Sequence, residues 1–291
     1  MSSPITLALS TFLRDTLFTL LLTAIVATGV ASVPYDKARL NNYAYKHHYM
    51  ETHAEEIKVL LLGNSYFEYS VNPHLLGDSV FDLATAARYP HYDVELLRRY
   101  APSMSNLRVC LFPLAALQGY PERFRLPCAR DHYLYMGIDP PEEWGDMGTL
   151  NAYSRQFSFR NLRSRMECDS IGYQSEGTAT TGKRVTIDTD SNYFAICTAY
   201  LTELARICHE RHVRFVLVTP PHCNHLVDRS NGGKLTDGLE AVVAAVQSRY
   251  PAEYLNYIDQ MQADSLYYDA MHLNHTGASE FARRLKDDLG L

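Results

Sequence analysis

The chain has 291 residues, of which 46% are hydrophobic and 21% charged, enough for one sizeable α/β domain with an insertion or for two small domains. Its net charge is −6 and it carries no basic run, which argues against nucleic acid as a partner. The six cysteines form no Cys-x-x-Cys pair, so the sequence does not indicate a zinc ribbon.

The amino-terminal region contains an uncharged apolar stretch at 16–33, preceded by a mostly apolar segment at 4–13. Together they are long enough to cross a bilayer, and we expect residues 1–34 to form an uncleaved membrane anchor. A cleaved signal peptide is the alternative, because the small residues at 29–31 offer a cleavage site, and a buried soluble helix is a third interpretation. The polar residues 35–57 are interpreted as a stalk.

The first predicted strand is the apolar run 59–62, which ends at Gly63 and Asn64 and is followed by Ser65. A short apolar run closed by a turn signal is typical of a buried strand in a parallel sheet. Ser65 would then lie at the carboxyl edge of the sheet, where open α/β sheets bind ligands. Because Glu68 stands three residues later, a helix-capping box is the alternative role for this serine.

The rest of the chain alternates strands with helices. Further strands are predicted at 79–84, 107–114, 213–219 and 253–258, the last at a sheet edge, and helices at 92–100, 194–210, 235–249 and 277–289. This alternation predicts a three-layer α/β fold, with a flavodoxin-like parallel sheet and helices on both faces. Between 118 and 191 the pattern breaks down, and we interpret this stretch as a partly helical insertion that forms a lid or a partner surface, with disorder as the alternative.

Asp269 and His272 precede the last predicted helix with the spacing Asp-x-x-His. Alone, this pattern is more often structural than catalytic. One short turn can nevertheless carry both a base and the carboxylate that orients it. Aspartate then fixes the imidazole tautomer, and the other ring nitrogen takes a proton from Ser65.

Two other clusters have a weaker chemical signal. His222, Cys223 and His225 follow the fourth predicted strand, but no carboxylate pair stands near them, so we favour a polar loop beside the cleft over a metal site. Cys128 and Cys168 lie in the irregular region and are candidates for a disulfide if that region lies outside the cytoplasm.

With these motifs in place, the chain resembles the SGNH (GDSL-type) hydrolases. The matching positions are Gly63, Asn64 and Ser65 for the first block of the family, with Asn64 where aspartate is more usual, and 269–274 with Gly277 for the last block. The resemblance is closest to the membrane-associated branch of bacterial cell-envelope and polysaccharide-modification proteins. It implies an SGNH-like domain at 58–291, interrupted by the insertion at 118–191.

Two parts of the family's oxyanion site have no clear counterpart. The second block lacks its glycine, so the resemblance points to the backbone N–H groups of Ala86 or Ala87 as donors, with Asn64 beside them. The third block lacks its asparagine, since 113–116 reads Pro-Leu-Ala-Ala. Loss of one such donor costs about 100- to 1000-fold in rate, and Arg88 is our first candidate for a replacement.

The resemblance implies a serine esterase or acyltransferase that acts on acyl esters, chiefly O-acetyl esters, of a cell-surface polysaccharide. Ser65 would attack the acyl carbonyl, His272 would take its proton and Asp269 would orient His272, with no metal or organic cofactor. Expected partners are the glycan or its ester, a multi-span membrane acyltransferase, and the membrane through the amino-terminal segment. The expected location is the cytoplasmic membrane with a periplasmic domain, or secretion after signal cleavage. The alternative is a catalytically inactive assembly or carbohydrate-binding subunit with the same fold.

Overall fold

The computed structural model describes residues 4–32, 41–115, 122–145, 166–175, 177, 191–223, 234–269 and 271–291. The chain divides into two compact units, at Met1–Lys37 and Ala38–Leu291, and each is described by itself.

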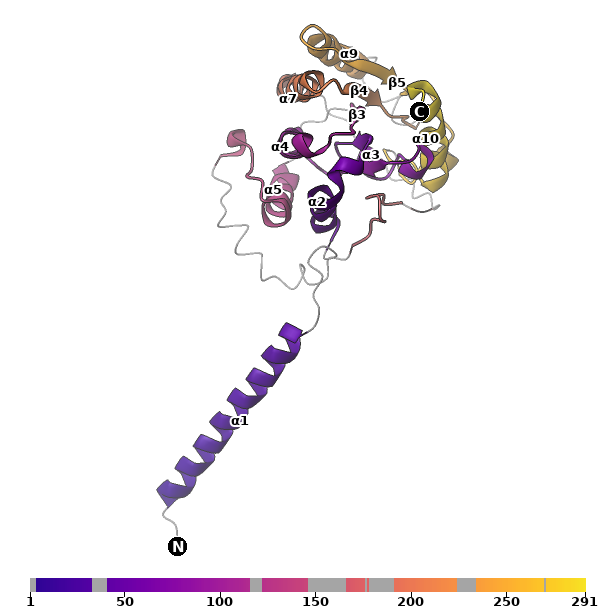
Figure 1. The fold of residues 1–291 in the computed structure, drawn as a ribbon. Helices are drawn as coiled ribbons and strands as arrows, with labels where there is room; N and C mark the ends of the chain where they lie inside the picture. The colour runs from indigo at the N-terminus through magenta and orange to yellow at the C-terminus, as the bar shows by residue number, and fades with distance from the viewer. Residues whose placement is uncertain are drawn as a thin grey trace. The chain divides into compact units, whose positions relative to one another are not determined.

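The first unit contains helix α1 (Pro4–Ser32, Figure 1). Large apolar side chains along α1 are exposed, Leu17 most of all at 69%. An exposed ion pair between Arg14 and Asp15 interrupts this apolar surface. No helix in the described part of the chain is long and apolar enough to cross a membrane, so the anchor expected at 1–34 is not supported.

The second unit is built on a parallel sheet of five strands. They are β1 (Val59–Leu61), β2 (Val80–Asp82), β3 (Val109–Pro113), β4 (Arg214–Thr219) and β5 (Glu253–Asn256). Their order in the sheet is β2-β1-β3-β4-β5, and all neighbours run parallel. This is the flavodoxin-like order, whose direction of winding reverses between β1 and β3. The predicted strands and the edge position of β5 are therefore confirmed.

Helices lie between the strands along the chain. The α-helices of this unit are α2 (Asn42–His53), α3 (Ser65–Glu68), α4 (Pro90–Tyr100), α5 (Glu122–Met136), α7 (Ser191–Glu210), α9 (Lys234–Gln247) and α10 (His275–Leu289). Short 3-10 helices are η2 (Ala54–Glu56), η3 (Pro73–Leu75), η4 (Ala101–Ser103), η5 (Glu142–Trp144) and η8 (Asp264–Leu266). The four helices predicted from periodicity correspond to α4, α7, α9 and α10.

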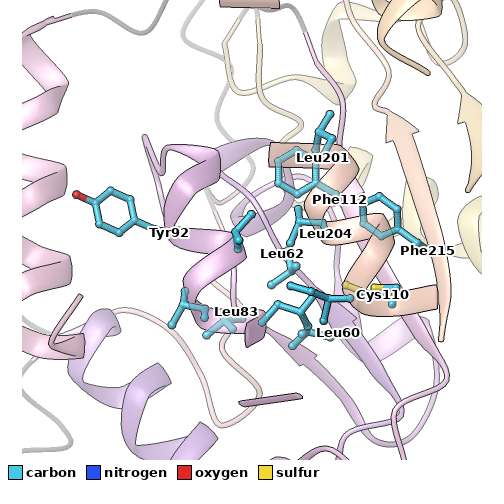
Figure 2. Close-up of a cluster of buried hydrophobic side chains, with 14 of the residues drawn as sticks. Leu60, Leu62, Leu83, Tyr92, Cys110, Phe112, Leu201, Leu204 and Phe215 are labelled. Carbon is cyan, nitrogen blue, oxygen red and sulfur yellow. The ribbon is translucent and has the colours of Figure 1, made fainter. Parts of the chain in front are cut away.

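The sheet separates two hydrophobic clusters, because side chains alternate along each strand. Leu60 and Leu62 face the first cluster, while Val59 and Leu61 face the second. Helices α2, α4, α7 and α9 contribute to the first cluster, and α3 and α10 contribute to the second, on the opposite face (Figure 1). Figure 2 shows the first cluster, with Leu60, Leu62, Leu83, Tyr92, Cys110, Phe112, Leu201, Leu204 and Phe215 labelled. The predicted three-layer arrangement is therefore confirmed.

Part of the segment interpreted as a stalk, 35–57, belongs to this unit. Asn41 caps α2 by accepting a hydrogen bond from the Ala44 N–H. Met50 and Ile57 are buried in the first hydrophobic cluster. Residues 42–57 are thus an integral part of the domain rather than a stalk, because their apolar side chains complete its core.

The predicted insertion at 118–191 is described at 122–145, 166–175, 177 and 191 only, and its helical portion is α5. Its later part follows the outer edge of β2, where the Asp82 N–H donates to the Ile171 carbonyl at 2.8 Å. A Cβ atom on Gly172 would stand 2.1 Å from the Asp82 carbonyl oxygen, so the two backbones are in close contact. The insertion therefore covers an edge that would otherwise expose unpaired backbone groups.

The disulfide considered for Cys128 and Cys168 is not formed, and both side chains are buried. Cys128 lies on α5 with its Sγ 3.6 Å from Nδ1 of His132. The Cys168 N–H donates to the side chain of Asn42, and burial raises the pKa of its thiol to about 12. Both cysteines serve as packed core residues in this structure.

Candidate active site

The turn after β1 fixes the position of the candidate nucleophile. Gly63 has φ +98°, and a Cβ atom there would lie 2.3 Å from Cδ of Pro113, so only glycine fits without a shift. The Gly63 carbonyl accepts the Thr85 N–H at 3.1 Å, and its own N–H donates to Oδ1 of Asp93 at 2.8 Å. Held on both sides, the turn delivers Ser65 to the carboxyl edge of the sheet, at the β1/β3 reversal where such folds bind ligands.

Asn64 caps helix α3. Its side-chain oxygen accepts the Tyr66 N–H at 3.1 Å. The oxyanion role expected for Asn64 would need an N–H donor and stays a prediction. The capping box considered between Ser65 and Glu68 is not formed, because Asn64 occupies the N-cap position and Ser65 is the first helical residue. Glu68 is buried instead, with an oxygen 3.8 Å from Nζ of Lys46. The Ser65 hydroxyl is therefore not used as a cap.

Ser65, His272 and Asp269 meet at this edge, as the sequence predicts. Nε2 of His272 lies 2.9 Å from Oγ of Ser65, and Nδ1 lies 3.0 Å from both carboxylate oxygens of Asp269. Oδ1 of Asp269 also accepts the N–H groups of Met271 and His272, each at 2.8 Å. One tight turn thus holds the carboxylate and the imidazole together in front of the serine.

The charge of Asp269 suits this arrangement. Burial acts to raise the pKa of its carboxyl group, but the hydrogen bond and charge of His272 and the two backbone N–H groups outweigh burial and lower it. An ionised Asp269 accepts a hydrogen bond from Nδ1–H of His272. Nε2 is then left with a lone pair directed at the Ser65 hydroxyl, which is the geometry of a general base.

Two tyrosines that the sequence did not single out flank the imidazole. The ring of Tyr66 lies 5.7 Å from that of His272 at 44°, and the ring of Tyr69 lies 5.5 Å away at 83°. Both follow Ser65 on or just after α3. Their position on the nucleophile helix was the available signal, but the sequence alone did not show that His272 would pack between them.

The predicted oxyanion donors directly follow Thr85, whose N–H contacts the turn at Gly63. Ala86 and Ala87 form a partly exposed turn between β2 and α4, and Ala87 has φ +54°. The Ser65 N–H has no carbonyl four residues back within α3, since the first amides of any helix lack one. At the end of β3, Leu114 and Ala115 are buried and offer no polar side chain. In the described part of this segment, no side chain replaces the missing third-block donor, and the N–H groups of Ala86, Ala87 and Asn64 stay the predicted donors.

Arg88 does not replace the missing donor, and that expectation is wrong. Its side chain is buried, with Nη1 donating to Oδ1 of Asp93 at 3.2 Å and Nε donating to Nε2 of His132 at 3.2 Å. A buried guanidinium must be paired to offset its desolvation, and here Asp93 supplies that pairing.

His222 lies behind Tyr66, with the two rings 5.8 Å apart. It is fully buried, neither ring nitrogen has a hydrogen-bond partner among the residues that the structure describes, and burial lowers its pKa to about 4. His225 falls outside the described residues. Among those that are described, no group of three side chains is placed to hold a metal ion, so the metal interpretation of this loop gains no support.

Several solved structures are similar to this chain in fold. No family model matches the chain, and no curated protein matches it either. A Streptococcus pneumonia protein provisionally described as a platelet activating factor is 12% identical, with a TM-score of 0.49 over 85% of this chain and 91% of that one. A GDSL-like lipase from Bacteroides thetaiotaomicron is 9% identical, with a TM-score of 0.44 over 85% of this chain and 99% of that one. A Bacteroides fragilis protein provisionally described as an acylhydrolase is 12% identical, with a TM-score of 0.43 over 84% of this chain and 97% of that one. Since each TM-score is below 0.5, the functional argument rests on the site itself.

Proposed function

We propose that this protein is a serine-dependent ester hydrolase or acyltransferase of the SGNH (GDSL-type) kind. The observation that carries the proposal is the contact of 2.9 Å between Oγ of Ser65 and Nε2 of His272, with Asp269 on the opposite ring nitrogen. A nucleophile in contact with a base that a third group orients is the arrangement that activates a serine hydroxyl.

The reaction follows from these contacts. Oγ of Ser65 attacks the acyl carbonyl while its proton passes to Nε2 of His272. The oxyanion that forms is stabilised by backbone donors, for which we propose the N–H groups of Ser65 and Ala86. His272 then gives its proton to the leaving alcohol, and an acyl-Ser65 ester remains. Water or a sugar hydroxyl, deprotonated by His272, attacks this ester, and the acyl group leaves as a free acid or as a new ester.

For the substrate we propose an O-acyl, chiefly O-acetyl, ester of a cell-surface glycan, handled outside the cytoplasm with a multi-span membrane acyltransferase as a partner protein. The sequence resemblance to envelope proteins supports this choice. We further propose transfer to a sugar as the physiological outcome, because a site that lacks the third-block donor at Leu114 and Ala115 suits an activated acyl donor better than rapid hydrolysis of free esters.

The test uses purified protein and Ser65→Ala with p-nitrophenyl acetate, with and without acetyl-accepting oligosaccharides, following free acid and acetylated sugar. A fluorophosphonate probe reports on the reactivity of Ser65 independently of the substrate. Labelling of wild type but not of Ser65→Ala, with ester turnover lost in the variant, supports the proposal. Hydrolysis unaffected by any acceptor argues against transfer.

A non-catalytic subunit of a polysaccharide system is the second candidate. The observation that favours it is the missing polar donor at the end of β3, where Leu114 and Ala115 are buried. Absence of probe labelling at Ser65, with wild type and Ser65→Ala equally inert toward esters, would establish this candidate in place of the enzyme.

A further inference from the structure

A buried carboxylate reaches the nucleophile turn from behind. Asp93 lies in the first turn of α4 and is fully buried. Its Oδ1 accepts the Gly63 N–H at 2.8 Å and Nη1 of Arg88 at 3.2 Å. Gly63 stands two residues before Ser65 in the chain. Asp93 therefore contacts the backbone that carries the nucleophile and not the reacting atoms themselves.

The same carboxylate holds the second loop of the site. Arg88 ends the loop that contains Ala86 and Ala87, and its N–H donates to the Thr85 carbonyl at 3.1 Å. The Thr85 N–H donates in turn to the Gly63 carbonyl at 3.1 Å. Asp93, Arg88, Thr85 and Gly63 therefore form a closed ring of contacts that ties the turn before Ser65 to the loop carrying the proposed oxyanion donor.

The ring is anchored in the core by His132. Nδ1 of His132 lies 2.8 Å from the Cys128 carbonyl, to which it donates, so Nε2 is the acceptor for Nε of Arg88. The imidazole also stacks on Tyr92, with ring centroids 3.8 Å apart at 19°. The guanidinium is thus fixed on two sides, and Asp93 cannot shift without breaking several buried contacts.

We propose that Asp93 is a positioning residue for the serine reaction, holding Ser65 and the Ala86–Ala87 loop at a fixed separation through Gly63 and Arg88. This inference rests on the proposed function. In this proposal Arg88 does not contact the substrate. It supports the site by donating a hydrogen bond to Asp93.

The test compares two double variants in the full chain, Asp93→Asn/Arg88→Met and Asp93→Leu/Arg88→Met. Both remove the buried ion pair and leave His132 without its donor, so these costs are shared. The Asn variant keeps a side-chain oxygen for the Gly63 N–H, and the Leu variant does not. We expect kcat of the Leu pair to be roughly 10- to 100-fold below that of the Asn pair, with KM within about twofold, because small misplacements of reacting groups cost rate rather than binding.

Hydrogen exchange adds a readout that needs no turnover and no variant. In wild type, the Gly63 amide should exchange as slowly as the Leu62 amide, which donates within the sheet to the Leu111 carbonyl at 2.9 Å. Exchange of Gly63 more than about 100-fold faster than Leu62 would show that the contact does not persist, and would overturn the inference even if the Leu variant failed to fold.

The outcomes separate this inference from the proposed function. Equal kcat in the two double variants, with wild type active, overturns the positioning role alone. A wild type whose Ser65 reacts with neither ester nor fluorophosphonate overturns both. A lower kcat in the Leu pair, with thermal unfolding of the two pairs within a few degrees, supports the positioning role.

Discussion

Oγ of Ser65 and Nε2 of His272 lie 2.9 Å apart although 207 residues separate them in the chain. Ser65 comes from the turn that ends β1, and His272 from the turn that precedes α10. The two turns meet because the parallel sheet places the end of β1 at one edge, while α10 packs its apolar face against the second hydrophobic cluster. The contact is thus a product of topology, and it places a base on a serine that is free of any capping role.

The first prediction concerns Asp269. Asp269→Asn should lower kcat about 10⁴-fold, because the neutral amide does not hold the Nδ1–H tautomer of His272 and cannot stabilise the imidazolium by charge. Asp269→Ala should lose at least as much activity. It should also unfold more easily, by about 1–2 kcal/mol, since the Met271 and His272 N–H groups lose their acceptor. Steady-state kinetics and urea denaturation measure the two effects separately. Near-normal kcat in Asp269→Asn would contradict the orienting role.

The second prediction concerns Gly63. Gly63→Ala should lower the free energy of unfolding by roughly 2–5 kcal/mol, because a Cβ atom would meet Pro113 at 2.3 Å and the backbone has φ +98°. Gly137→Ala is the matched control: its φ is also positive, at +60°, but its Cβ would enter open space, so we expect a loss of about 1 kcal/mol. Denaturant titration measures both values, and equal losses would show that contact with Pro113 is unimportant.

The third prediction uses the buried His222. Its folded pKa of about 4 lies below the value of about 6.5 expected for the unfolded chain. As pH falls from about 6.5 to 4, the unfolded state binds a proton before the folded state does, and stability is lost. His222→Phe removes this loss, so its stability relative to wild type should rise by about 2 kcal/mol between pH 8 and pH 5. A constant difference across that range would contradict the neutral, buried state of His222.

The fourth prediction concerns Asp82, for which stability changes with pH in the opposite direction. Burial raises the pKa of Asp82 to about 7, while Lys46 acts to lower it and Glu68 to raise it. Between pH 4 and pH 7 the unfolded chain releases the Asp82 proton but the folded chain keeps it, so stability falls as pH rises through this window. In Asp82→Asn this fall, on the order of 2–4 kcal/mol, should be absent. The measurement is the difference between wild type and variant at each pH, and parallel curves would refute it.

Apolar runs made the sheet predictable. Strands such as β1 and β3 are buried on both faces, so their sequences read as continuous aliphatic stretches, and only their ends differ by one or two residues from expectation. The meeting of Ser65 and His272 was predictable as well, because turn chemistry marked the end of β1 and the Asp-x-x-His spacing marked a second turn before the last helix.

The roles of long polar side chains were not predictable in the same way. Arg88 was interpreted as an oxyanion donor and Glu68 as part of a capping box, yet their side chains are buried beside Asp93 and Lys46. The segment that contains α2 was interpreted as a stalk because its sequence is polar and rich in tyrosine, histidine and asparagine, whereas its burial depends on the core that later segments provide. Local composition cannot show such pairings, since they are decided by packing.

The pairing of the outer edge of β2 with the insertion has a consequence for the nascent chain during synthesis. Ile171, whose carbonyl receives the Asp82 N–H, follows that residue by 89 positions. At a synthesis rate of about 5–20 residues per second, roughly 4–18 s pass between the synthesis of Asp82 and that of Ile171, and the outer edge of β2 is unpaired during this time. During that interval the strand presents open backbone groups to every other nascent chain nearby. A ribosome that stalls between the two positions releases a polypeptide with an uncovered edge, and such fragments should depend on chaperones to stay dispersed.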